Sequence, residues 1–226
     1  LPSILRDREV QFAVALSLET SLISAALALL VGVPVGYFLA RTNFTGKTLV
    51  DAFLDVPTSI SPVALGTLLL ISLGTPAGQA LQKYLFPIVF SVPGIVLAQF
   101  TIAVALTTRL AKAVFDTVDP HYELVARVLG ESQWGAFRRV TLPMTRPGIV
   151  SAFFLAWARS LGEFGATVTL AGATKFKTET LPTAIYLNLA SLQIDKALVL
   201  IWILLILSCV VLWAVRRLDR RRSVRT

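Results

Sequence analysis

Long apolar segments restrict the fold of this chain more than any other feature. Residues 197–215 contain no charged side chain, and residues 21–40 supply about the 20 residues that a helix needs to cross a bilayer. The composition agrees, because 55% of the residues are hydrophobic and only 15% are charged, with a mean hydropathy of +0.75. An average soluble domain carries about 25% charged residues. We therefore predict an all-α integral membrane protein.

Five membrane-spanning helices are predicted within a single transmembrane domain, residues 12–215, which a basic tail at residues 216–226 follows. The second span has a cluster of Asp55, Pro57 and Pro62 in its first half. Such an irregular backbone either lines a cavity inside the protein or forms a bent helix start at the membrane surface. Residues 74–92 and 171–196 are predicted to be loops. The five spans are expected at about residues 12–40, 52–73, 93–110, 148–171 and 197–215.

The positions of the basic residues predict the orientation of these spans. If the amino end lies outside, 14 of the 21 lysines and arginines fall on the cytoplasmic side and six on the outer side. This is the asymmetry that membrane proteins show. The net charge of +8 therefore reflects cytoplasmic loops and the tail, and no nucleic-acid partner is expected. The carboxyl end and the loop at residues 119–147 are placed in the cytoplasm.

The loop at residues 119–147 has its own helical pattern. Leu124, Val125, Val128 and Leu129 recur at the spacing of an amphipathic helix. Gly130 is expected to break that helix or to let another element pack closely against it. A second helical piece is predicted at residues 132–139, with Pro143 at its end.

This loop resembles the cytoplasmic EAA loop of ABC-importer permeases. Ala126, Gly130, Val140 and the Leu142–Pro143 pair match the family pattern, whereas its glutamate and first alanine fall on Leu124 and Val125, with Glu123 one position early. The resemblance implies a coupling helix that docks in a groove of an ATP-hydrolysing subunit. The alternative is an ordinary amphipathic helix on the membrane surface. The residues implied in coupling are Glu123, Leu124, Val125, Ala126, Gly130, Leu142 and Pro143.

Polar residues within the spans suggest a translocation path. Arg159 and Glu163 are four residues apart, so on a continuous helix they share one face and can pair. Ionisable groups in a span usually face a bundle interior or a water path, so the pair either borders the path or fixes helix packing. Ser59, Ser61 and Thr67 either offer hydrogen-bond donors to an anion or pack between helices.

The segment that contains Arg159 and Glu163, ARSLGEFGATVTLAG, resembles permeases of the molybdate and tungstate group. This resemblance implies the permease subunit of an ATP-driven importer for a tetrahedral oxyanion in the cell membrane. It also implies a second copy of the chain, two ATP-binding cassette subunits that bind ATP and magnesium, and an extracytoplasmic oxyanion-binding protein. Two alternatives remain open: a sulfate or thiosulfate permease of the same class, and a secondary transporter driven by an ion gradient.

The chain is not expected to be an enzyme or to bind a cofactor. Gly46, Lys47 and Thr48 lack the earlier glycine of a phosphate-binding loop. With one cysteine and one histidine, Cys209 and His121, a metal site is not expected either. ATP hydrolysis is therefore assigned to another chain.

Overall fold

The computed structural model describes residues 4, 6–84 and 86–223, and it describes side chains up to Trp213. Within this part the chain is helical and has no strand. The helices α2 (Arg8–Arg41), α6 (Val92–Asp116) and α9 (Leu142–Leu161) pack side by side, and α12 (Ile194–Ser223) covers α9 and α11 (Leu181–Ala190). The predicted tail falls within and beyond α12, where the side chains lie outside the described residues.

Close packing between α2 and α6 depends on two glycines. A Cβ atom on Gly36 would lie 2.8 Å from the Ala111 Cβ, and one on Gly32 would lie 3.0 Å from the Thr107 Cβ. Small residues at such positions allow membrane helices to approach each other. Pro34 lies between the two glycines, yet α2 continues through it as one helix. The pair α2 and α6 therefore forms the closely packed centre of the fold.

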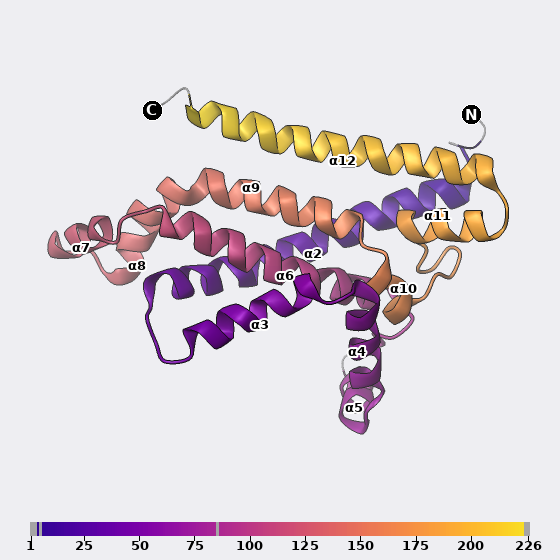
Figure 1. Ribbon diagram of the computed structural model, residues 1–226, viewed down its shortest axis with the longest axis horizontal. Helices are drawn as coiled ribbons and strands as arrows, with labels where there is room; N and C mark the ends of the chain where they lie inside the picture. Colours follow the sequence, from indigo (N-terminus) through magenta and orange to yellow (C-terminus); the bar gives the residue numbers. More distant parts are fainter. Residues whose placement is uncertain (1–3, 5, 85, 224–226) are drawn as a thin grey trace.

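The second predicted span is broken, as its prolines indicated. Helices α3 (Lys47–Ser59) and α4 (Pro62–Gly74) meet at a bend of 107°. Figure 1 shows α4 projecting away from the long helices, with α5 (Pro76–Tyr84) at its tip. The predicted loop at residues 74–92 is wrong in this part, because α5 lies within it. The loop at residues 171–196 likewise contains α11.

The fourth predicted span, residues 148–171, is not one helix. The helix α9 begins at Leu142, with Pro143 in its first turn, so Pro143 opens this helix rather than closing the preceding one. It ends at Leu161, and α10 (Gly165–Ala171) follows after a break. Gly162 takes no part in a continuing helix, and the chain turns there.

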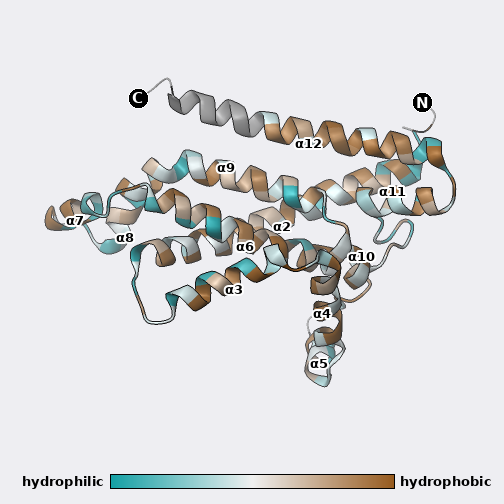
Figure 2. Ribbon diagram, in the orientation of Figure 1, coloured by the Kyte–Doolittle hydropathy of each residue, from teal (hydrophilic) through white to brown (hydrophobic). Residues whose placement is uncertain are grey.

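The apolar character of the helices differs along the chain (Figure 2). Among the described residues, α2, α6 and the part of α12 up to Trp213 are each long and apolar enough to cross a membrane, and the bent pair α3–α4 makes a fourth crossing if counted as one span. The number five and the orientation remain predictions. In Figure 1 the α2–α3 connection, the loop with α7 (His121–Val128) and the carboxyl end of α12 lie toward the same end of the molecule, as that orientation requires.

Candidate functional site

The loop between α6 and α9 folds into three short helical pieces. The Asp119 carboxylate accepts a hydrogen bond from the backbone N–H of His121, the first residue of α7, at 2.9 Å. Gly130 follows α7 with a φ of +96°, a conformation that favours glycine. Ser132 then caps α8 (Gln133–Ala136) by accepting from the Gly135 N–H at 3.0 Å. The predicted helix, break and second helical piece are all confirmed.

A π-helical turn, η1 (Phe137–Thr141), joins α8 to α9 without interruption. The wider turn changes the direction in which side chains point relative to a regular helix, and such turns occur often at functional sites. Leu142 is partly buried and packs against the cluster of Phe115 and Phe137, whereas Pro143 is exposed. Of this pair, only Leu142 is held by the core.

One face of α7 exposes apolar side chains to solvent. Val128 is 87% exposed and Leu129 80%, and Leu124 and Val125 are about half exposed. Ala126 is partly buried. Contiguous exposed apolar side chains on a protein surface usually mark an interaction site. The amphipathic pattern in the sequence therefore points its apolar side outward, away from the helices of this chain.

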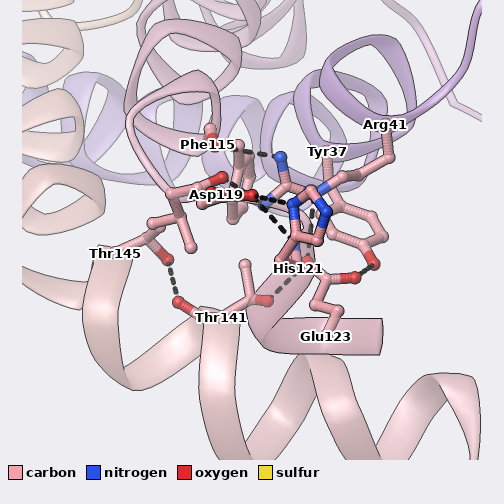
Figure 3. A network of polar contacts seen from close by, with 9 residues as sticks. Tyr37, Arg41, Phe115, Asp119, His121, Glu123, Thr141 and Thr145 are labelled. Carbon is pink, nitrogen blue, oxygen red and sulfur yellow. Dashed lines mark hydrogen bonds and ion pairs between the residues drawn. The ribbon is translucent and has the colours of Figure 1, made fainter. Parts of the chain in front are cut away.

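Glu123 lies on the opposite face of α7 and points into the helices (Figure 3). Its carboxylate accepts three hydrogen bonds, from the Tyr37 Oη at 2.7 Å, the Arg41 Nε at 2.9 Å and the Thr141 Oγ1 at 2.5 Å. Burial alone would raise the pKa of Glu123. The hydrogen bonds from Thr141, Tyr37 and Arg41 and the charge of Arg41 outweigh it, so the pKa lies below its ordinary value.

Arg41 extends this network to the end of α6. Its Nη1 donates to the Phe115 carbonyl at 3.2 Å and its Nη2 to the Val118 carbonyl at 3.1 Å. The polar network of Tyr37, Arg41, Glu123 and Thr141 therefore ties α7 to α2, to the end of α6 and to η1. The sequence analysis missed Tyr37, Arg41 and Thr141, because Tyr37 and Arg41 lie more than 80 positions from Glu123 and Thr141 lies 18 positions away, beyond any local pattern.

The predicted pair in the fourth span is formed, but not on one helix face. The Arg159 Nη1 donates to the Glu163 Oε2 at 2.6 Å, although Glu163 lies in the break after α9. The other oxygen of Glu163 accepts from the Ala166 N–H at 3.1 Å in the first turn of α10. Glu163 is 2% exposed, while 38% of the Arg159 side chain is accessible. The arginine therefore keeps donors that Glu163 does not use.

The two chain breaks lie side by side because α4 packs directly against α10. A Cβ on Gly66 would lie 2.7 Å from the Ala166 Cα, and a Cβ on Gly165 would lie 3.0 Å from the Val63 nitrogen. Ser59, Ser61 and Thr67 are exposed beside this contact. Thr67 donates to the Val63 carbonyl at 2.8 Å, within its own helix.

Taken together, the described residues combine long apolar helices with an anchored loop that exposes an apolar surface. The described residues contain no group of His, Cys, Asp or Glu arranged to hold a metal ion. The chain belongs to the family described as the binding-protein-dependent transport system inner membrane component, whose model matches residues 32–224. It is therefore a multi-pass membrane protein of the ABC-transporter permease class.

Relatives within this family agree with the assignment. The chain is 40% identical over 186 residues to the molybdenum transport system permease protein ModB of Escherichia coli K12, covering 81% of each chain. It is 34% identical over 217 residues to the sulfate transport system permease protein CysW of Synechocystis, covering 95% of this chain and 79% of that one. The fold is similar to a chain of a bacterial alginate ABC transporter, with a TM-score of 0.77 at 17% identity over 97% of this chain and 81% of that chain.

Proposed function

We propose that this chain is the permease subunit of an ATP-driven importer for a tetrahedral oxyanion, molybdate or tungstate. One observation carries the choice of cargo, namely the 40% identity over 186 residues to a molybdenum transport permease. The family assignment supports import driven by a separate ATPase. The importer would comprise two copies of this chain, two ATP-binding cassette subunits and an extracytoplasmic oxyanion-binding protein.

The loop geometry supports a coupling role for residues 119–147. The exposed side chains of Leu124, Val125 and Val128 offer an apolar face that fits a groove on the ATPase. Glu123, on the opposite face, links α7 to α2 through two hydrogen bonds and to η1 through a third. When ATP binding moves the docked helix, these bonds transmit the displacement to the membrane helices. ATP and magnesium bind to the partner subunit in this proposal, and this chain performs no hydrolysis.

The path for the anion runs along the two chain breaks in this proposal. Glu163 pairs with Arg159 through one guanidinium nitrogen, and the arginine side chain remains 38% accessible and presents further N–H donors. The exposed hydroxyls of Ser59 and Ser61 add uncharged donors beside the break between α3 and α4, and Thr67 would join them by releasing its bond to the Val63 carbonyl. An ion-paired guanidinium with free N–H donors and neighbouring hydroxyls binds an oxyanion weakly, which suits an ion that must leave again.

Sulfate is a second candidate cargo. The sulfate transport relative is 34% identical and covers 95% of this chain, more than the molybdenum relative covers. Sulfate, molybdate and tungstate are all tetrahedral dianions, so the same donors serve each of them.

Competition uptake in proteoliposomes tests the proposal. The vesicles would contain this permease with its ATPase and binding protein, and uptake of labelled molybdate would be followed with excess tungstate or sulfate, with and without ATP. We expect ATP-dependent uptake that tungstate blocks and sulfate does not. Block by sulfate would indicate that the cargo is sulfate, the second candidate. Uptake without ATP would favour a secondary transporter and contradict the proposal.

A further inference from the structure

An apolar groove of about 750 Å³ lies on the outer face of α2, where α8, η1 and the start of α9 form its other wall. On that wall, Trp134, Phe137 and Leu142 contribute side chains. The α2 residues follow a spacing of three and four, so they form one stripe along the helix. These residues are Ala26, Leu29, Leu30, Val33, Pro34 and Tyr37.

The groove has the length of one membrane leaflet. From Tyr37 to Ala26 the stripe covers 11 residue steps, which correspond to about 16 Å of helix. Half of a hydrocarbon core of about 30 Å is about 15 Å. Tyr37 lies one turn from the end of α2 at Arg41, and Ala26 lies near the middle of the helix. The groove therefore extends from the α7 end of the molecule to about mid-membrane.

An unpaired cation lies at the end of the groove nearest α7. Arg138 directly follows Phe137, which lines the groove, and it lies in η1 between the groove residues Trp134 and Leu142. Arg138 is exposed, and it makes no ion pair or hydrogen bond with any described residue. The neighbouring Arg139 differs, because it pairs with Glu131. Trp134, which is 68% exposed, adds the amphipathic ring that is typical of a membrane surface.

We propose that this groove binds an anionic phospholipid, with one acyl chain along α2 and the phosphate at Arg138. An apolar slot of one-leaflet length with a free cation at its mouth complements a single-chain lipid segment and its negative headgroup. A second copy of this chain fits less well. Its α7 end would bring further basic side chains, such as Arg127 and Arg146, against Arg138.

The site adjoins the polar network that holds α7. Tyr37 lines the groove with its ring and donates its hydroxyl to Glu123 at 2.7 Å. Phe137, on the other wall, stacks on Trp134 with ring centroids 5.3 Å apart. A bound acyl chain therefore contacts the two side chains that position α7 and α8, so lipid occupancy stabilises the loop.

Native mass spectrometry of the purified full chain tests this proposal. The chain would be titrated with dioleoyl phosphatidylglycerol or dioleoyl phosphatidylcholine, and lipid adducts would be counted. We expect tighter binding of phosphatidylglycerol. Arg138→Gln should weaken it about fivefold, which corresponds to about 1 kcal/mol for one basic residue at a membrane surface. Arg127→Gln removes the same charge from α7, outside the groove, and should leave the adducts unchanged.

A second pair of variants tests the groove itself. Leu30 is 72% exposed and lines the groove, so Leu30→Trp fills the slot without disturbing a buried contact. Leu22 is exposed on the same helix but does not line this groove, and Leu22→Trp is the matched control. We expect loss of phosphatidylglycerol adducts in Leu30→Trp alone. Equal binding of both lipids, unchanged by Leu30→Trp and Arg138→Gln, would overturn the proposal. Dissociation of a dimer by Leu30→Trp would overturn it in favour of a second copy in the groove.

Discussion

Two buried glutamates at opposite ends of the molecule have opposite surroundings. Glu123, beneath α7, accepts hydrogen bonds from three side chains, and its pKa is lowered. Glu179, in the segment between α10 and α11, is fully buried, and neither of its carboxyl oxygens has a hydrogen-bond partner among the described residues. Burial, together with the nearby carboxylate of Glu9, raises the pKa of Glu179 to about 7. The surroundings of Glu123 favour its charged form, whereas those of Glu179 favour its protonated form.

The charges around Glu179 show why it differs. Glu9, at the start of α2, forms an ion pair with Lys175, with the Glu9 Oε1 2.6 Å from the Lys175 Nζ. Lys196 is 2.7 Å from Asp7 and 3.6 Å from Glu9. Lys175 and Lys196 are therefore both paired with carboxylates other than that of Glu179. The comparison shows that a buried carboxylate stays charged where nearby side chains donate hydrogen bonds to it, as they do for Glu123 and not for Glu179.

Removing the hydrogen-bonded carboxylate of Glu123 should lower the stability of the chain more than any other change. Glu123→Ala leaves Arg41 without its carboxylate in a partly buried site, and we expect a loss of about 3 kcal/mol in the free energy of unfolding. Thermal unfolding of the purified chain in detergent measures it. The control is Glu131→Ala in the same loop, whose pair with Arg139 is exposed on the arginine side, so its loss should stay below about 1 kcal/mol. Equal losses in the two variants would show that the network around Glu123 stabilises the chain no more than an exposed ion pair does.

A substitution on the exposed face of α7 should lower the affinity for the ATPase and leave the stability of the chain nearly unchanged. Val128→Asp changes a side chain that is 87% exposed, so stability should stay within about 0.5 kcal/mol. Affinity for the ATPase should fall at least about tenfold, because a carboxylate would be buried in an apolar groove. The control is Leu192→Asp, an 83% exposed residue at the other end of the molecule. Surface plasmon resonance with the ATPase immobilised gives both affinities, and an unchanged affinity in Val128→Asp would exclude this face as the docking surface.

Substitution of Glu179 should give a smaller effect on stability, and that effect should depend on pH. Because the pKa of Glu179 rises on folding from 4.5 to about 7, stability is lost as pH rises through that interval and the penalty is complete above it. Glu179→Gln removes the charge, so its melting temperature should exceed that of the wild type by about 2–4 °C at pH 8 and be little changed at pH 5. Glu131→Gln is the control. A variant that follows the pH profile of the wild type would show that Glu179 holds no proton.

Much of this fold follows from sequence pattern. The apolar runs predict α2, α6 and α12, the prolines around residue 60 predict the break between α3 and α4, and the spacing from Gly130 to Pro143 identifies the loop. The break after α9 was missed, because residues 148–171 were interpreted as one continuous span. The partners of Glu123 were missed because they come from α2 and η1, and only packing brings these elements together. The roles of Arg159, Glu163, Ser59, Ser61 and Thr67 remain predictions.

The central claim is that hydrogen bonds from the membrane helices to Glu123 carry motion from the docked loop to the path. Tyr37→Phe tests it most directly, because it removes one bond of 2.7 Å and keeps the ring that packs on Phe115 and Phe137. Molybdate uptake and ATP hydrolysis would be measured in the same proteoliposomes, with Tyr186→Phe, a tyrosine on α11, as the control. We predict that Tyr37→Phe keeps its hydrolysis and transports fewer ions per ATP. An unchanged ratio of ions to ATP would contradict the account.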